Sequence, residues 1–470
     1  MGIMPSEKHA KWNPIEYPWH SPLPDNPQSP EARFEDHGPD AVLAKLSDRY
    51  PVRVLTRKDL PNIYHWLRSP AYRGRTLLNA PYHYGFAYSF LIQAARYNPR
   101  NYLVHYGKGR DRGFFLITTK NPGKTPFVIL SPVGNIGKHV ANFAQELADI
   151  SKDNVIVKKA HPALFKELVS LGGGDYRKDE EGYEYRAPHG DDSYSGPVVL
   201  TSDVMNPPDD AIRWEINRRL KEFGHALQRK LTGYRLEVEQ YDPRKHQIDA
   251  ESMLHTWAPE FAVRYYMEKH KDKDGNPQKG TPKEYKAIAD AAIEDHMAFL
   301  NMTPDFQDIH AYMGYLVKRN SSNEAEARIP LGYVSFEKTG FLTRNSAREI
   351  IKSIGRTKFT SKRRSHQTLW HYITNPKTDR AGATRSIRRR VESCYTMPAC
   401  PVITDLIRQG PFALEYEAIK RLHGEGSNQT PASLLNLTGS EHEKLFKFKM
   451  AFGPIYKHPS KQIVFHPKES

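Results

Sequence analysis

Hydrophobic and polar positions along the chain follow two spacings, one typical of strands and one typical of helices. Early in the chain, 101–120 predicts two strands around a glycine-rich hairpin. Residues 125–134 predict a buried strand, because almost all of their side chains are apolar. The next stretch, 135–152, has apolar residues one helical turn apart. A strand at 154–160 and a helix ending at the glycines of 172–174 follow.

A long helical pattern at 207–233 separates this set from a second one of similar order. The second set again begins with a strand and helices, continues with paired strands, and ends with strand, helix and strand. Its strands are expected at 234–241, 309–319, 327–338, 368–375, 432–437 and 461–467, and its helices at 249–270, 285–301, 381–395 and 440–452. The last strand, 461–467, is expected to close the sheet of this second set.

The order of elements indicates a mixed α/β fold, α+β-like in character, because the leading strands of each set pair as hairpins. We expect a disordered arm at 1–48, where proline, histidine and charged residues dominate. A first lobe would span 49–200, a connecting helix 201–232, and a second lobe 233–470. The predicted architecture is therefore two lobes in tandem, joined by a long helix.

Composition adds a preference for acidic partners. The 470 residues include 69 Lys and Arg against 54 Asp and Glu, a net charge of +15. Such a balance favours nucleic acid, an anionic membrane surface or a phosphorylated small molecule. Two cysteines, Cys394 and Cys400, provide no disulfide framework, and no window is apolar enough for a transmembrane segment. We therefore expect a cytoplasmic protein.

The stretch 434–454 contains the sharpest candidate for chemistry. Its helix has an apolar stripe at Leu445, Phe448 and Phe452, and Lys449 lies beside that stripe. A lysine in such a place commonly extends its ammonium to water. The alternative is that the ammonium reaches a cleft and meets a phosphate or a polarised carbonyl.

The same stretch resembles the closing signature of the phosphatidylglycerol lysyltransferase C-terminal domain, whose architecture Fem-type aminoacyltransferases share. The matching residues, in the arrangement N-L-x-G-S-E-x-x-x-L-x-x-x-K-x-x-F-x-P, are Asn436, Gly439, Leu445, Lys449 and Pro454. Stretches 214–228 and 368–391 also resemble that family. The resemblance covers 209–467, with a looser similarity at 52–190. It implies two tandem acetyltransferase-like (GNAT) lobes and an aminoacyl-tRNA as donor.

Transfer from an aminoacyl ester needs no nucleotide-binding loop or cofactor, because the ester is already activated. It needs an acceptor held near the carbonyl, a base, and donors for the oxyanion. Backbone N–H groups of a splayed central strand or of a helix N-terminus could donate. Asn436 could orient the acyl group, Glu441 could be the base, and Lys449 could neutralise charge. Glu441 equally suits the positive end of a helix without any catalytic role.

A basic cluster is the candidate tRNA-binding surface. Acidic residues are almost absent between 352 and 390, and aromatic residues lie among the cations. Such a composition suits phosphate contacts and base stacking, although a run of charge is more often a solvated helix face. The cations expected to bind tRNA are Arg363, Arg364, Arg385, Arg388, Arg389 and Arg390.

The acceptor stays open, as a lipid or sterol hydroxyl or amine, or a small natural-product intermediate. The membrane span of the resembling family is absent, so only a peripheral membrane contact is considered.

Two rival functions remain. The stretch 379–384 resembles, with a shortened spacing, the pyrophosphate loop of acetyl-CoA users, which favours an acyl-CoA-dependent N-acyltransferase. The other rival is a non-catalytic RNA-binding protein. No histidine spacing predicts a metal site.

Overall fold

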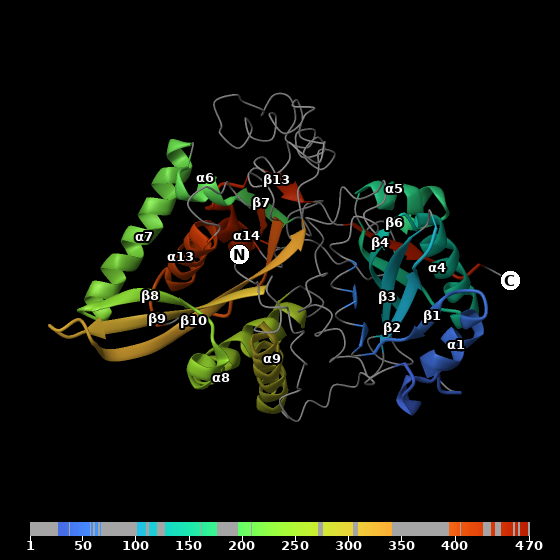
Figure 1. Ribbon diagram of the computed structural model, residues 1–470, viewed down its shortest axis with the longest axis horizontal. Coiled ribbons are helices and arrows are strands. Elements are labelled where there is room, and N and C mark those ends of the chain that lie inside the picture. The colour runs from blue at the N-terminus through green and yellow to red at the C-terminus, as the bar shows by residue number, and fades with distance from the viewer. Residues whose placement is uncertain are drawn as a thin grey trace, which may run out of the picture.

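The computed structural model describes two lobes, each built on one sheet (Figure 1). The described residues are 27–36, 38–56, 58–59, 62–63, 66, 101–109, 112–119, 127–160, 162–175, 196–207, 209–270, 276–303, 309–340, 394–404, 406–425, 434–437, 443–454, 456–458 and 461–468.

The first sheet has the strand order β1-β2-β3-β4-β5-β14-β6. Neighbouring strands are antiparallel except β4 and β5, which run parallel. Its strands are β1 (Val52–Val54), β2 (Asn101–Tyr106), β3 (Gly113–Thr119), β4 (Phe127–Gly134), β5 (Val155–Ala160), β6 (Gly174–Asp175) and β14 (Lys461–Phe465). Its helices are α1 (Gly38–Ser47), α4 (Gly137–Ser151) and α5 (Pro162–Ser170).

One face of the first sheet is covered by α1, α4 and α5, whose apolar residues share a core with alternate strand residues. The prediction of a disordered arm over 1–48 is therefore wrong in part. Leu43 and Leu46 of α1 are fully buried in this core, so 38–47 folds with the first lobe. The short 3-10 helix at Pro30–Ala32 precedes it.

The second sheet has the order β13-β7-β12-β11-β10-β9-β8, and its single parallel pair is β11 and β12. Its strands are β7 (Gly196–Leu200), β8 (Tyr234–Gln240), β9 (Ile309–Arg319), β10 (Ala325–Gly340), β11 (Cys394–Ala399), β12 (Leu434–Asn436) and β13 (Tyr456–His458). Its helices are α6 (Thr201–Met205), α7 (Asp210–Lys230), α8 (Pro243–Lys269), α9 (Pro282–Met302), α13 (Gly410–Glu425) and α14 (Glu443–Met450).

Helices cover both faces of the second sheet. The face that includes Tyr312 and Leu316 packs against α7, α13 and α14. The opposite face, with Met313 and Tyr315, packs against α8 and α9. The latter cluster also contains Phe114 and other residues of the first sheet, so one continuous apolar core joins the two lobes. The mixed α/β fold expected from the sequence is confirmed.

The two lobes exchange strands. The C-terminal strand β14 lies between β5 and β6 of the first sheet, and β7 lies between β12 and β13 of the second. In Figure 1, the red β14 lies among the teal strands, and the green β7 lies beside orange and red ones. Each exchanged strand is apolar on both faces, as a central strand must be: Ile463 to Phe465 and Val198 to Leu200 are at most 1 % exposed.

Two predictions about elements are wrong. The strand at 461–467 exists, but it closes the first sheet, because its buried residues fill the place next to β5. The helix predicted over 381–395 does not include its last two residues, since Cys394 and Tyr395 begin β11 and pair with both β10 and β12. The remainder of that predicted helix, and the strand at 368–375, lie outside the described residues.

Candidate active site

Each sheet contains a fork, where its one parallel pair of strands separates. In the first lobe, β4 and β5 pair from Phe127 to Leu130, and no described residue of β5 pairs with the remainder of β4. In the second lobe, β11 and β12 pair from Cys394 to Thr396, and β12 ends while β11 continues to Ala399. We call these the first fork and the second fork.

A β-bulge marks each fork. In the first lobe, Ser131 and Pro132 of β4 lie opposite the single residue Phe115 of β3. In the second lobe, Met397 and Pro398 of β11 lie opposite Phe336 of β10. A bulge bends its strand, and proline has no N–H to donate to a neighbouring strand. In each lobe the bulge thus coincides with the place where the parallel pairing ends, as in the splayed central strand that the sequence analysis considered as one possible source of N–H donors.

The chain beyond the second fork stays close to β10. Gly332 allows this approach, because a Cβ there would lie 2.6 Å from the carbonyl oxygen of Pro401. The N–H of Tyr333 donates to that same oxygen at 3.1 Å. The segment after β11 is thereby held against β10, and Cys400 lies at the exit of the bulged strand.

Two charged side chains are buried beside this exit. Lys449 of α14 is 4 % exposed and Glu415 of α13 is 3 % exposed. The Cys400 side chain is hydrogen-bonded to the Glu415 carboxylate, and the Lys449 ammonium interacts electrostatically with both residues. Among the described residues, the second carboxylate oxygen of Glu415, Oε2, has no hydrogen-bond partner. A buried acceptor without a partner is costly.

Burial sets the protonation chemistry of this cluster. It raises the pKa of Glu415 to about 7, and the nearby Lys449 ammonium partly opposes the rise. Burial also raises the pKa of the Cys400 thiol, and the Glu415 carboxylate adds to that effect. A carboxyl group with a pKa near neutrality can both accept and return a proton, which is what general acid–base catalysis requires.

A second buried hydrogen bond borders the exit on the other face of the sheet. The Tyr333 hydroxyl and Nδ1 of His296 on α9 are hydrogen-bonded, and the Trp257 ring meets that imidazole edge to face. Burial lowers the pKa of His296, which keeps the imidazole neutral. Burial also raises the pKa of Tyr333, and the neighbouring Cys400 adds to the rise. The Tyr333–His296 pair and the Glu415 cluster are thus neighbours, because Tyr333 interacts electrostatically with Cys400.

The structure describes two of the residues predicted for catalysis. Lys449 is buried beside Glu415, so its ammonium does not extend to water. Asn436 is the last residue of β12, and its backbone lies opposite Thr396 and Val198. Glu441 lies outside the described residues. So do all six arginines predicted to bind tRNA: Arg363, Arg364, Arg385, Arg388, Arg389 and Arg390.

Sequence reasoning missed Glu415, although the sequence contains a signal for it. Glu415 lies three residues after Phe412 and four before Ile419, both of which are fully buried. A glutamate at these spacings falls within the apolar stripe of an amphipathic helix. Buried carboxylates are rare without a partner or a function. The partner, Lys449, is distant in sequence, and only the fold brings the two together.

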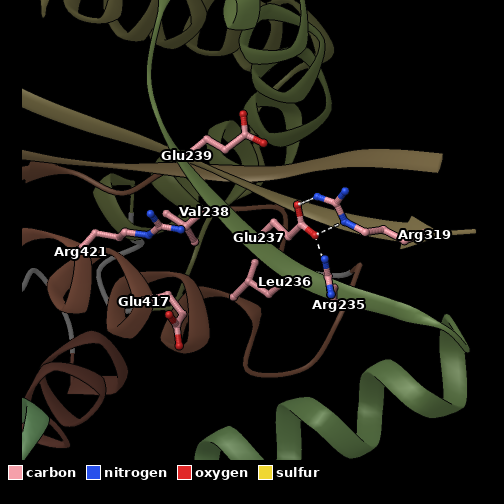
Figure 2. Close-up of a pocket in the computed structure, with 8 residues that line it drawn as sticks. All are labelled: Arg235, Leu236, Glu237, Val238, Glu239, Arg319, Glu417 and Arg421. Atoms are coloured by element: carbon pink, nitrogen blue, oxygen red, sulfur yellow. Dashed lines mark hydrogen bonds and ion pairs between the residues drawn. The ribbon is translucent and has the colours of Figure 1, made fainter. Parts of the chain in front are cut away.

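A surface pocket of about 340 Å³ lies elsewhere, on the edge strand β8 (Figure 2). Its arginines and glutamates pair mainly with one another. Glu237 accepts from Arg235 at 2.7 Å and from Arg319 at 2.6 Å, and these bonds lower its pKa to about 2. The pocket is three strands away from β11 in the sheet, so it is separate from the second fork.

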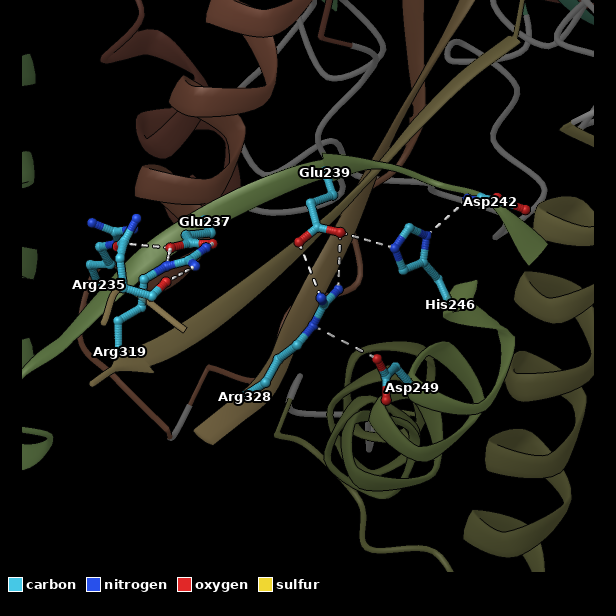
Figure 3. A network of polar contacts seen from close by, with 9 residues as sticks. Arg235, Glu237, Glu239, Asp242, His246, Asp249, Arg319 and Arg328 are labelled. Atoms are coloured by element: carbon cyan, nitrogen blue, oxygen red, sulfur yellow. Dashed lines mark hydrogen bonds and ion pairs between the residues drawn. The ribbon is translucent and has the colours of Figure 1, made fainter. Parts of the chain in front are cut away.

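The polar network in Figure 3 lies near this pocket and ties α8 to the sheet. Arg328 of β10 pairs with Glu239 at 3.1 Å, and Glu239 accepts a bond from His246 at 3.1 Å. The N–H of Asp242 donates to the other ring nitrogen of His246 at 2.9 Å. Because Glu239 of β8 bonds to both Arg328 of β10 and His246 of α8, this network fixes the start of α8 against β8 and β10.

Within the described residues, no three His, Cys, Asp or Glu side chains gather as metal ligands. None of the helices in the described ranges is long and apolar enough to cross a bilayer.

Comparison with known proteins gives structural likenesses only. No family model matches the chain, and no curated protein matches it. A conserved protein of unknown function from Bacteroides thetaiotaomicron has a TM-score of 0.49 at 12 % identity, covering 88 % of this chain and 98 % of that one. A tandem GNAT protein from the clavulanic acid biosynthesis pathway, without AcCoA, has a TM-score of 0.40 at 11 % identity, covering 89 % and 99 %. Likeness at this level carries no argument about what the chain does.

Proposed function

We propose that the protein is an acyltransferase with two GNAT-like lobes, which moves an amino acid from aminoacyl-tRNA to a hydroxyl or amine acceptor. One observation carries the acyl-transfer part. The second fork ends beside a buried carboxylate that has an oxygen without a partner among the described residues, and a buried ammonium lies next to it. This combination offers a proton acceptor and a positive charge at one place.

In the proposed reaction, the acyl carbonyl lies at the second fork and Glu415 takes the proton of the attacking hydroxyl or amine. The carbonyl oxygen gains negative charge as the new bond forms, and Lys449 stabilises that charge. The ester bond to the RNA then breaks, and the proton held by Glu415 passes to the departing ribose oxygen. Asn436, at the end of β12, orients the acyl group. The first fork helps to hold the acceptor.

The choice of an RNA-borne donor rests on the resemblance of the closing stretch to aminoacyltransferases and on the net charge of +15. The acceptor is a lipid, or a sterol or other small molecule, with a free hydroxyl or amine. The reaction requires no cofactor, because the aminoacyl ester supplies the energy of the transfer.

The test is transfer of label from aminoacyl-tRNA to small molecules or lipids of a cell extract. We expect label in the organic or small-molecule fraction, lost when the tRNA is digested with RNase beforehand. Glu415→Gln should lower the rate at least roughly a hundredfold, as loss of a general base does. The matched control is Glu417→Gln on the same helix, because Glu417 is half-buried and pairs only with Lys420 in the described part of the chain.

Other outcomes point to the rivals. Transfer from acetyl-CoA, with none from aminoacyl-tRNA, would establish a coenzyme A-dependent N-acyltransferase at the same fork. Binding of tRNA without any loss of its amino acid would indicate a non-catalytic RNA-binding protein. Full activity of Glu415→Gln would remove the Glu415 cluster from the mechanism, even if label were transferred.

A further inference from the structure

The solvent side of α7 has an unusual composition. Trp214 is 64 % exposed. Among the described residues, it is the one aromatic residue in the group of exposed large apolar side chains. Residues that follow it at helical spacing are polar or basic and also exposed: Asn217, Lys221, His225 and Gln228. Arg213 and Arg229 border the same side. We call these seven residues the α7 face.

The acidic residues of the middle of α7 do not cancel this charge. Glu215 receives bonds from Arg218 at 2.8 Å and from Arg219 at 2.6 Å. Glu222 pairs with Arg218 and accepts a bond from Gln409 at 3.1 Å. Arg218, which lies beside Trp214, and the more buried Arg219 therefore neutralise both glutamates. Lys221 has no ion pair with any described residue and is free to meet an external anion.

The spacing of the cations suits a nucleic-acid strand. Lys221 lies eight residues from both Arg213 and Arg229, which is about 12 Å along the helix axis in each direction. A nucleic-acid strand has one phosphate per about 3.4 Å, so each cation can meet a different phosphate. Arg213 contributes least, because it also pairs with Asp210 at 2.9 Å. Exposed Asn217 and Gln228 add groups that can donate to and accept from bases.

Trp214 adds a stacking surface. The Arg218 guanidinium lies 5.5 Å from the centre of its ring and holds one side of the indole, while most of the side chain faces solvent. Unpaired bases stack on such exposed aromatic rings. An anionic membrane would instead require an apolar stripe, and Trp214 is the one large apolar residue of the α7 face.

From this geometry we infer that the α7 face binds single-stranded RNA, with an unpaired base on Trp214 and phosphates on Lys221 and Arg229. This inference deepens the proposed function, on which it rests: the RNA is the end of the tRNA that carries the amino acid. The face is on the second lobe, and α7 packs directly on α13, the helix that holds Glu415: Arg219 of α7 lies over the Phe412 ring at 5.2 Å. The α7 face is thus a binding surface separate from the arginines predicted from the sequence.

The test measures binding of uncharged tRNA and of a short unstructured RNA at several salt concentrations. Trp214→Ala should weaken binding of the unstructured RNA about fivefold or more, as loss of one stacked base does. The double variant Lys221→Glu, Arg229→Glu should weaken binding of both RNAs. The slope of the logarithm of the binding constant against the logarithm of the salt concentration should become less steep by nearly two, the value expected for two lost phosphate contacts. The controls are Ile248→Ala, an exposed apolar residue on α8, and Lys286→Glu on α9, which is 76 % exposed.

The outcomes separate this inference from the proposed function. Wild-type protein that binds tRNA, with unchanged binding by all α7 variants, overturns the α7 face and leaves the RNA donor standing. Wild-type protein that binds no RNA overturns both. Loss of binding to anionic phosphatidylserine vesicles in the α7 variants, with RNA binding intact, assigns the face to a membrane surface and overturns our inference.

Discussion

Replacing Lys449 by methionine tests whether the buried pair at the second fork is electrostatic in the way the structure indicates. Methionine keeps most of the length and packing of the side chain and removes the charge. At pH 8, above the Glu415 pKa of about 7, the variant leaves a carboxylate in the core without its neighbouring cation. Because that carboxylate can take up a proton instead, and pH 8 lies one unit above the wild-type pKa, the substitution should cost at most about 1.4 kcal/mol more unfolding free energy at pH 8 than at pH 5.

The same substitution should cost less at pH 5. There Glu415 is protonated, so the variant strands no negative charge, and removal of a desolvated ammonium offsets the lost packing. We expect a cost of less than about 1 kcal/mol. The direction follows from linkage. A carboxyl whose pKa is raised by folding stabilises the protein less as pH rises from its ordinary 4.5 to about 7, and removing Lys449 extends that loss to higher pH.

The measurement is urea unfolding, followed by circular dichroism, at pH 5 and pH 8. Lys447→Met is the matched control, because Lys447 is exposed two residues earlier on the same helix. The double variant Lys449→Met, Glu415→Gln should be more stable at pH 8 than Lys449→Met alone, since no charge is left unpaired. Equal costs at the two pH values, or no rescue in the double variant, would refute the electrostatic interpretation.

Three further predictions concern the fold. Deleting 461–470 should unfold the first lobe, because β14 lies inside its sheet, and limited proteolysis should then cut the first lobe and spare the second. Gly113→Ala should lower the free energy of unfolding by at least about 1–3 kcal/mol in denaturant titration, because its Cβ would lie 2.2 Å from the carbonyl oxygen of Val133 at the bulged strand. Tyr333→Phe should remove the partner of His296, whose pKa falls from 6.5 to about 4 on burial. In wild-type protein this histidine makes stability fall as pH drops from about 6.5 to about 4, and the variant should move that window, as measured by thermal unfolding.

The local pattern of the sequence was sufficient for most elements. Strands β2, β3 and β4, and the helices α4, α7 and α9, lie where hydrophobic spacing predicts them, because each buries one face or one stripe against its own neighbours. The mixed character of the sheets also follows from the order of elements. The apolar stripe of 440–452 correctly predicts α14, together with the presence of Lys449 beside it.

The partners of those elements could not be read from the sequence. The last strand, 461–465, is equally apolar whichever sheet it enters, and only the space beside β5 decides that it completes the first lobe. The same holds for β7, which pairs with β12 across more than two hundred residues of chain. Strand patterns specify which residues are buried, whereas pairing depends on which edge is left open once the other strands have assembled.

The candidate site divides in the same way. The sequence alone determined that Lys449 lies at an apolar stripe near a strand end. It predicted neither the helix of Glu415 nor that residue, although the spacing of Phe412, Glu415 and Ile419 contains the signal. Only the tertiary structure decided that these two charges share one buried place beside Cys400, because α13 and α14 pack on the same face of the second sheet. Their chemistry arises from that meeting: in water each would be an ordinary surface charge, and desolvation is what brings the carboxyl pKa close to neutrality.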